Sequence, residues 1–132
     1  MTPQELVESA KFAQRNSYAP YSGFKVGAAL ITKSGKVYSG CNIENSCYTP
    51  TVCAERTAFF KAVSEGENDF EAIAIVGSYK NGEYKRYCYP CGVCRQVMRE
   101  FCTPDFKIIL GSDTENIEIT TLGALLPHSF EL

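Results

Sequence analysis

Three cysteines in two short segments have the spacing of a metal site. Cys53 lies in the segment TVCAER, and Cys91 and Cys94 lie in the segment PCGVCRQ. Three thiolates can bind a zinc ion and leave its fourth coordination position open, which is typical of catalytic rather than structural sites. Glu55, two residues after Cys53, is a carboxylate that can carry protons for a water at that position. The sequence therefore predicts a zinc centre that activates water.

Both cysteine segments are predicted to lie where a helix begins. Cys91 and Cys94 are three residues apart, so their side chains share one helical face. Three thiolates and one zinc ion leave a negatively charged site, which makes the ion a poorer Lewis acid. Helix N-termini draw charge off the sulfurs, and we expect Arg56 and Arg95 to act in the same direction.

Three other sites use the same residue types. A Cys-x-x-Cys pair alone is typical of redox dithiols. Cys88, Cys91 and Cys94 also form a C-x2-C-x2-C run, as in iron–sulfur proteins, although Met98 stands where their fourth cysteine is expected. A structural zinc site would use Cys88 or Cys102 as a fourth ligand. From the two motifs alone, these alternatives stay open beside the catalytic zinc.

Composition narrows the class of protein. The length of 132 residues predicts one domain, residues 1–132, and the net charge of −2 argues against a nucleic-acid partner. No apolar run is long enough to span a membrane, and the N-terminus lacks the features of a signal peptide. An odd count of seven cysteines argues against a disulfide scaffold. We therefore expect a cytoplasmic protein with a small, neutral substrate.

The elements that must position the motifs alternate between helix and strand. A Thr2–Glu5 capping box with Pro3 predicts a first helix, and Gly66 ends a helix that we expect from about Thr51 to Glu65. Residues 42–50 and 79–89 are polar and are predicted to be irregular. Further helices are expected from Pro90 to before Pro104 and over 121–127, and strands over 24–32, 37–41, 72–76, 106–110 and 117–120. This order predicts an α/β layered domain with a mixed sheet.

Five segments together identify a family. They are YSGFKVGAAL (21–30), NIEN (42–45), the two cysteine segments, and LLPxxF (125–130). The chain resembles the small homotetrameric cytidine deaminases over nearly its whole length. The resemblance implies a three-layer α/β/α fold with a mixed five-stranded sheet. It also implies a hydrolytic deamination of cytidine and deoxycytidine by a zinc-bound hydroxide, with release of ammonia, in pyrimidine salvage.

The resemblance also assigns the residues around the metal and the substrate. It implies one zinc ion per subunit on the three cysteines, with Glu55 as the proton shuttle and Arg56 offsetting the thiolate charge. Asn42 and Glu44 would hold the ribose hydroxyls, and Phe24 would pack on the base. The backbone carbonyl of Ala54, or that of Pro90, would recognise the amine.

Two residues are expected to act across subunits. Phe130 resembles the aromatic residue that completes a neighbouring subunit's pocket, and Tyr48 is expected to reach the neighbouring site as well. These roles predict a homotetramer with shared active sites. His128 is expected not to bind metal, and we take Cys41, Cys47 and Cys102 as packing residues.

One neighbouring family has similar length and similar cysteine segments, namely the blasticidin-type deaminases. Their ribose-side segment differs from the NIEN segment at residues 42–45, which favours a nucleoside substrate. Cys88 departs from the usual family residue before the second cysteine segment, which raises the question of a fourth metal ligand.

Overall fold

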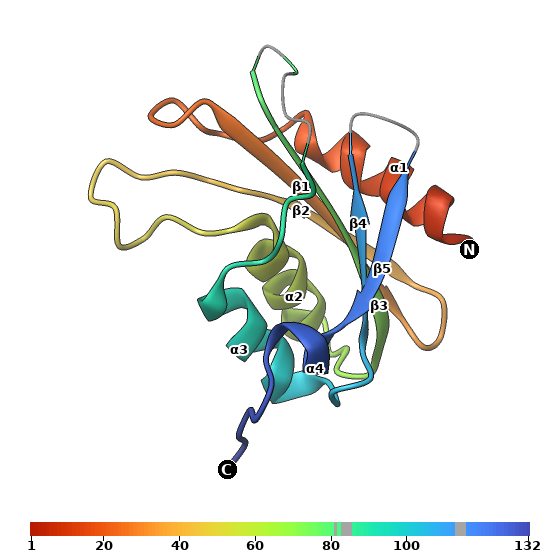
Figure 1. Cartoon of the computed structure of the whole chain (residues 1–132). Helices are drawn as coiled ribbons and strands as arrows, with labels where there is room; N and C mark the ends of the chain where they lie inside the picture. Colours follow the sequence, from red (N-terminus) through yellow and green to blue (C-terminus); the bar gives the residue numbers. More distant parts are fainter. Residues whose placement is uncertain (81, 83–85, 113–115) are drawn as a thin grey trace.

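A computed structural model of the chain describes residues 1–80, 82, 86–112 and 116–132 (Figure 1). The strands are β1 (Phe24–Thr32), β2 (Val37–Cys41), β3 (Phe70–Tyr79), β4 (Lys107–Gly111) and β5 (Ile117–Thr121), and the helices are α1 (Pro3–Gln14), α2 (Ala54–Ser64), α3 (Gly92–Phe101) and α4 (Leu122–Leu125). No helix in the described part of the chain has the length and apolar character needed to cross a membrane.

The five strands form one sheet in the order β2-β1-β3-β4-β5. β3 and β4 are parallel, and the other neighbouring pairs are antiparallel. The sheet is therefore mixed, as predicted. The hairpin of β1 and β2 has the predicted bounds, because the turn after Thr32 is closed by hydrogen bonds from Lys36 and Gly35.

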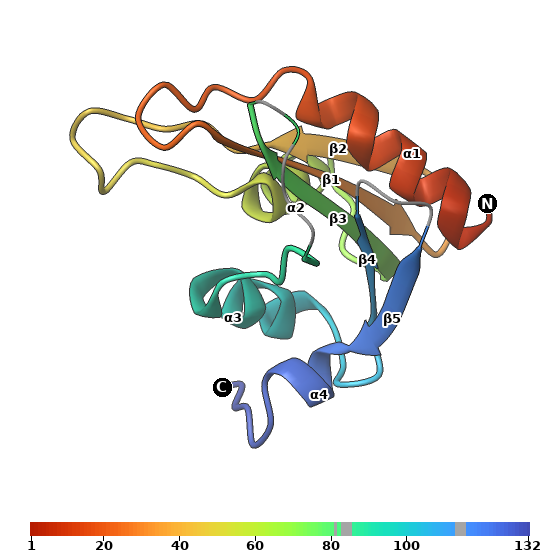
Figure 2. The same ribbon diagram turned by 45° about the horizontal axis from the view of Figure 1, so that its top comes forward.

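Helices cover both faces of this sheet (Figure 2). α1 lies on one face, and α2, α3 and α4 lie on the other. Alternate residues of the strands point to opposite faces, so the sheet has two apolar cores. The core beneath α1 includes Ala29, Ile31, Ala74, Val76 and Ile109, and the opposite core includes Ala28, Leu30, Ile73, Ile75, Ile108 and Leu110. The predicted three-layer α/β/α architecture is confirmed.

The local signals at the first helix act as predicted. The Thr2 side chain accepts from the backbone N–H of Glu5, and the Glu5 carboxylate accepts from the backbone N–H of Thr2. This capping box stabilises the start of α1, which packs Leu6, Val7 and Ala10 on the sheet.

The predicted starts of α2 and α3 and both predicted ends of β3 are wrong. α2 begins at Ala54 rather than near Thr51, and α3 begins at Gly92 rather than at Pro90. In both cases the cysteine takes the N-cap position with an extended backbone. Before Cys53, a β-bridge between Val52 and Ile43 keeps the chain extended. β3 runs from Phe70 to Tyr79 rather than over 72–76. The predicted 79–89 loop includes residues 81 and 83–85, which lie outside the described residues.

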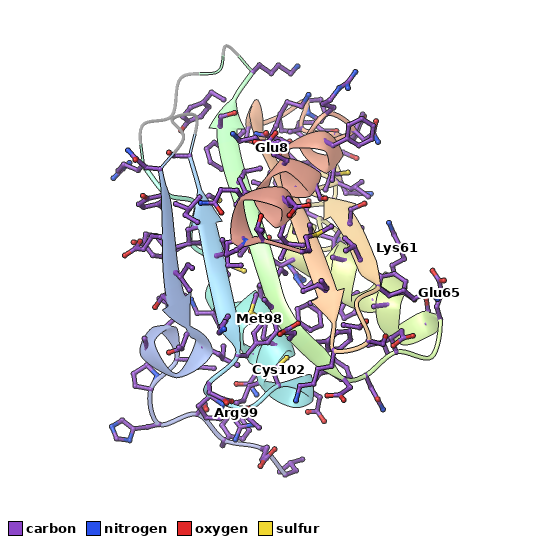
Figure 3. The ribbon with its side chains drawn as sticks, turned by 90° about the vertical axis from the view of Figure 1, so that its right-hand side faces the viewer. Glu8, Lys61, Glu65, Met98, Arg99 and Cys102 are labelled. Carbon is purple, nitrogen blue, oxygen red and sulfur yellow. The ribbon has the colours of Figure 1, made fainter. Side chains whose placement is uncertain are left out.

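A glycine in β2 sets the approach of α2. A Cβ atom at Gly40 would lie 2.6 Å from the carbonyl oxygen of Ala54 and 2.6 Å from the backbone nitrogen of Ala58. No side chain fits at such distances, so Gly40 lets the first turn of α2 rest directly on the strand. α3 packs on the same face, and its residue Met98 and the C-cap residue Cys102 lie behind the sheet in Figure 3. These contacts bring the two cysteine segments to one end of the sheet.

Candidate active site

The three predicted sulfurs converge. The Sγ atoms of Cys53, Cys91 and Cys94 lie within 4.8 Å of one another, with 3.7 Å between Cys53 and Cys91 and 3.4 Å between Cys91 and Cys94. A tetrahedral zinc ion with bonds of about 2.3 Å would hold its sulfurs about 3.8 Å apart, whereas a disulfide needs about 2.05 Å. The donor set therefore fits zinc.

The other cysteines stay outside this cluster. Among the described residues, the group of candidate ligands contains neither Cys88 nor Cys102. Burial raises the pKa of each of these two thiols to about 12, which disfavours the thiolate form that a metal requires. Two expectations for the remaining cysteines differ from the structure, since Cys47 is exposed rather than packed and Cys41 is only partly buried.

The helix starts hold two of the sulfurs. Cys53 and Cys91 are the N-cap residues of α2 and α3, and the Cys91 sulfur accepts from the backbone N–H of Cys94 at 3.4 Å. The positive ends of two helix dipoles are therefore directed at the thiol cluster and favour its negative charge.

The two arginines differ in what they contact. Arg56 Nη2 donates to the Cys53 sulfur at 3.3 Å. Hydrogen bonds from Cys94 and from Arg56 lower the pKa of Cys53 to about 5, although burial opposes them. Arg95 was expected to offset the thiolate charge as well, but its guanidinium instead donates to the carbonyl oxygens of Pro90 at 2.7 Å and Leu125 at 2.6 Å.

Glu55 is the only glutamate buried in the described residues, with 3% of its surface exposed. It lies in the first turn of α2, one residue after Ala54. Burial raises the pKa of Glu55 to about 7, against the effect of a hydrogen bond from its own backbone N–H. The carboxyl group also interacts with the Cys94 thiol. A carboxyl group of near-neutral pKa beside the sulfur cluster has the properties of a general acid–base.

A cavity of about 330 Å³ opens beside Glu55 and the sulfurs. This volume is in the range of small-ligand pockets. The cavity joins the metal cluster to the NIEN segment and to the start of β1. Its lining residues are Ser22, Phe24, Val26, Asn42, Glu44, Thr51, Val52, Cys53, Ala54, Glu55, Cys88, Tyr89 and Cys91.

Asn42 lines the cavity and also forms hydrogen bonds that stabilise the fold. Its Oδ1 accepts from the backbone N–H of Val26 at 2.9 Å and from the hydroxyl of Ser17, and its Nδ2 donates to the carbonyl of Phe24 at 2.9 Å. One N–H of the amide remains for a ligand. Asn42 therefore fixes the start of β1, which carries Phe24, in addition to facing the cavity.

Glu44 faces the same cavity and is held by a tight turn. Its carboxylate accepts from the backbone N–H of Tyr21 at 2.9 Å, from that of Ser22 at 3.2 Å, and from the hydroxyl of Ser22. These bonds lower the pKa of Glu44, so the carboxylate is charged at neutral pH. Sequence reasoning missed Ser22 as the partner of Glu44, although both stand in the segments that identify the family.

Tyr48 and Phe130 do not line the cavity of their own chain. Tyr48 is 77% exposed, in a turn with a φ of 64°, and Phe130 is 66% exposed near the C-terminus. Neither side chain is therefore part of the cavity wall within one chain. Sequence reasoning also missed Cys88, Val26 and Tyr89 as lining residues, because only the folded sheet brings them to the cavity.

Comparisons with known proteins identify the family. The family model described as the cytidine and deoxycytidylate deaminase zinc-binding region matches residues 1–110. The chain belongs to this family. It is 47% identical over 130 residues to the cytidine deaminase of Sporosarcina psychrophila, covering 98% of this chain and 92% of that one. As a member of the zinc-binding deaminase family with a three-sulfur site, the chain is a zinc-dependent hydrolase.

Solved structures of deaminases share its fold. The cytidine deaminase of Burkholderia pseudomallei superposes with a TM-score of 0.90 at 47% identity, covering 98% of this chain and all of that one. The cytidine deaminase of Mycobacterium tuberculosis gives a TM-score of 0.82 at 34% identity, covering all of this chain and 99% of that one. The chain is also 35% identical over 108 residues to a blasticidin-S deaminase of Bacillus cereus, covering 80% of this chain and 76% of that one.

Proposed function

We propose that this deaminase converts cytidine and deoxycytidine to the corresponding uridines and releases ammonia. The observation that carries the proposal is that one cavity contains both a reaction end, with Glu55 beside the sulfur cluster, and a polar end, with Asn42 and Glu44. The 47% identity to a cytidine deaminase over nearly the whole chain supports the choice of substrate. Such an activity belongs to pyrimidine salvage, and residues 1–132 act as one domain.

The nucleoside lies with its ribose at the polar end. The Glu44 carboxylate accepts from ribose hydroxyls, and the free N–H of Asn42 donates to one of them. The ring of Phe24 packs on the base. Ala54 lines the cavity and Pro90 does not, so the carbonyl of Ala54 is the better acceptor for the exocyclic amine.

Glu55 moves the protons of the reaction. Zinc on Cys53, Cys91 and Cys94 supplies a Lewis acid that activates water for attack on carbon 4 of the pyrimidine. Glu55 takes a proton from the attacking water and gives it to ring nitrogen 3, which makes carbon 4 more electrophilic. The second proton of the water passes through Glu55 to the amine, which then leaves as ammonia. Arg56 offsets the charge of the thiolates.

A homotetramer with shared active sites completes the proposal. Exposed apolar residues on α2 and α3, including Phe60 and Val93, line a surface hollow of about 520 Å³, as expected for a surface that is covered on assembly. Arg99 holds the C-terminal tail on both sides of Phe130, by a hydrogen bond to the Ser129 hydroxyl at 2.9 Å and an ion pair with Glu131 at 3.3 Å. The tail therefore presents the Phe130 ring outward to a neighbour.

All seven cysteines are free, which is typical of proteins in reducing compartments. We place the enzyme in the cytoplasm on this ground. Protein isolated from cells without reductant should keep all seven thiols free. A disulfide in that material would contradict the cytoplasmic location.

The direct test is turnover of cytidine by the purified protein, followed as the loss of ultraviolet absorbance. We expect cytidine and deoxycytidine to be deaminated, activity to disappear with a zinc chelator, and activity to return with added zinc. Cytosine should be a poor substrate, because it lacks the ribose that Asn42 and Glu44 bind. Blasticidin S is the alternative substrate to compare, and a higher kcat/KM for blasticidin S than for cytidine would overturn the proposal.

A further inference from the structure

Cys88 lines the cavity, but the proposed reaction gives it no role. It lines the same cavity as Phe24 and Glu55 and lies outside the cluster of metal ligands. It is partly buried and packs against the core beneath α2 and α3. The question is therefore which part of a bound nucleoside this thiol would touch.

The backbone of β3 fixes the position of Cys88. A Cβ atom at Gly77 would lie 2.8 Å from the Cys88 sulfur and 3.0 Å from Cε2 of Phe24. Both side chains therefore press against the same point of β3, where only a glycine leaves room. Because the strand lies directly behind it, the Cys88 sulfur has no space to retreat when a ligand fills the cavity.

The edges of the base differ in what they require from the cavity wall. A pyrimidine that lies on Phe24, with its ribose toward Asn42 and its amine-bearing carbon toward Glu55, has two edges left. One edge carries the carbonyl oxygen and nitrogen 3, which need hydrogen-bond partners, and nitrogen 3 must also meet Glu55. The other edge carries the two C–H groups at carbons 5 and 6. A thiol is small and bonds hydrogen weakly, so it matches the C–H edge.

We propose that Cys88 is a specificity-determining residue, whose sulfur forms the wall against carbon 5 of the pyrimidine and limits the size of the substituent there. The proposal rests on the proposed function, since it needs a cytidine in this cavity. According to this proposal, the site distinguishes cytidines that carry a group on carbon 5 from those that do not.

The test compares 5-methylcytidine with cytidine by the ratio of their kcat/KM values. We expect Cys88→Ala to raise this ratio by about tenfold or more over the original protein, since one methyl group in an apolar pocket commonly changes selectivity by about 10–200-fold. Cys88→Val, which adds bulk, should lower the ratio. Cys88→Ser keeps the size of the side chain and should leave the ratio unchanged. The intrinsic effect of the methyl group on reactivity is common to all variants and cancels in the comparison.

Two controls separate a wall contact from a general loosening of the fold. Cys102→Ala makes the same change at a buried thiol that lines no part of this cavity, and the ratio should not move. The ratio of deoxycytidine to cytidine should also stay constant in Cys88→Ala, because those substrates differ only at the ribose.

An unchanged 5-methyl ratio in Cys88→Ala, with cytidine still turned over, would overturn the proposal. If that variant does not fold, Cys88→Val decides, and an unchanged or higher ratio there would overturn it. Absence of cytidine turnover in the original protein would instead refute the proposed function, so the two failures are distinguishable.

Discussion

The carboxyl group of Glu55 is the side chain on which proton transfer depends. Replacing it by glutamine keeps the shape but removes the carboxylate that accepts and releases the proton, so we expect Glu55→Gln to lower kcat by at least about 10²–10⁴-fold. Zinc content, measured by mass spectrometry, should stay at one ion per subunit, because Glu55 is not a ligand.

Glu65→Gln is the matched control for this change. Glu65 ends the same helix and is exposed at its far end (Figure 3), so this substitution should leave kcat unchanged. Near-normal turnover in Glu55→Gln would show that another group carries the proton.

Asn42 combines a binding role with a structural one, and its substitution should reveal both. Asn42→Ala removes three hydrogen bonds that tie the NIEN segment to Ser17 and to β1. We expect a loss of about 1–3 kcal/mol in the free energy of unfolding, together with a higher KM for cytidine. Thermal denaturation and kinetics measure the two effects.

Glu44→Ala provides the contrast, because the hydrogen bonds of Glu44 lie at the surface. It should raise KM with a smaller loss of stability. Equal melting temperatures for Asn42→Ala and the original protein would contradict the structural role.

Local spacing predicted the reactive residues but not their surroundings. Cys53, Glu55, Cys91 and Cys94 were found from the sequence, because metal ligands and an adjacent acid leave a signature within a few residues. The place of Cys88 on the cavity wall was not found. It depends on Gly77 in a strand eleven residues earlier, and no local pattern encodes that contact.

The elements were predicted well in type and order, and less well at their ends. Short apolar runs bounded by turn residues marked the strands, and the hairpin bounds were found because short turns have strong residue preferences. The helix starts at Ala54 and Gly92 were placed two or three residues too early. Thr51 is a good helix-capping candidate in isolation, but a β-bridge between Val52 and Ile43 holds this part of the backbone extended.

The contact between α2 and β2 controls the position of Cys53 and Glu55. Gly40→Ala would place a methyl group 2.6 Å from two backbone atoms of α2, so the helix must shift. We expect a loss of about 1–3 kcal/mol in the free energy of unfolding, and lower zinc occupancy in the protein that remains folded. Metal analysis and thermal denaturation measure these effects.

The adjacent residue of β2 provides the control. Ser39→Ala removes only a hydroxyl group, and zinc occupancy should stay normal. Full zinc occupancy and unchanged stability in Gly40→Ala would mean that α2 does not depend on this close approach.

At the scale of the whole molecule, the metal joins parts of the chain that lie far apart in sequence. Its candidate ligands come from the starts of α2 and α3, which are separated by the whole of β3. The two cysteine segments already predicted this juxtaposition, and the family resemblance decided between the catalytic zinc and the redox, iron–sulfur and structural-zinc sites that spacing alone left open. Phe130 and Tyr48 are exposed and do not line the cavity, so their proposed roles require a second chain.

Sharing of active sites between subunits can be tested by mixing two defective proteins. Glu55→Gln lacks the proton shuttle, and Phe130→Ala lacks the aromatic ring proposed to complete a neighbour's pocket. Each protein alone should be impaired at every site. When the two are unfolded and refolded together, some mixed sites receive Glu55 from one chain and Phe130 from another, so activity should rise above the sum of the separate proteins.

The control is to refold the two proteins separately and to combine them afterwards. If folded subunits do not exchange, this mixture should show no gain in activity. Recovery requires both that subunits assemble and that the ring acts across the interface. If Phe130 acted only within its own chain, no mixed site would regain both groups, and activity would stay at the sum of the two preparations. Gel filtration of the refolded mixture establishes whether the tetramer formed.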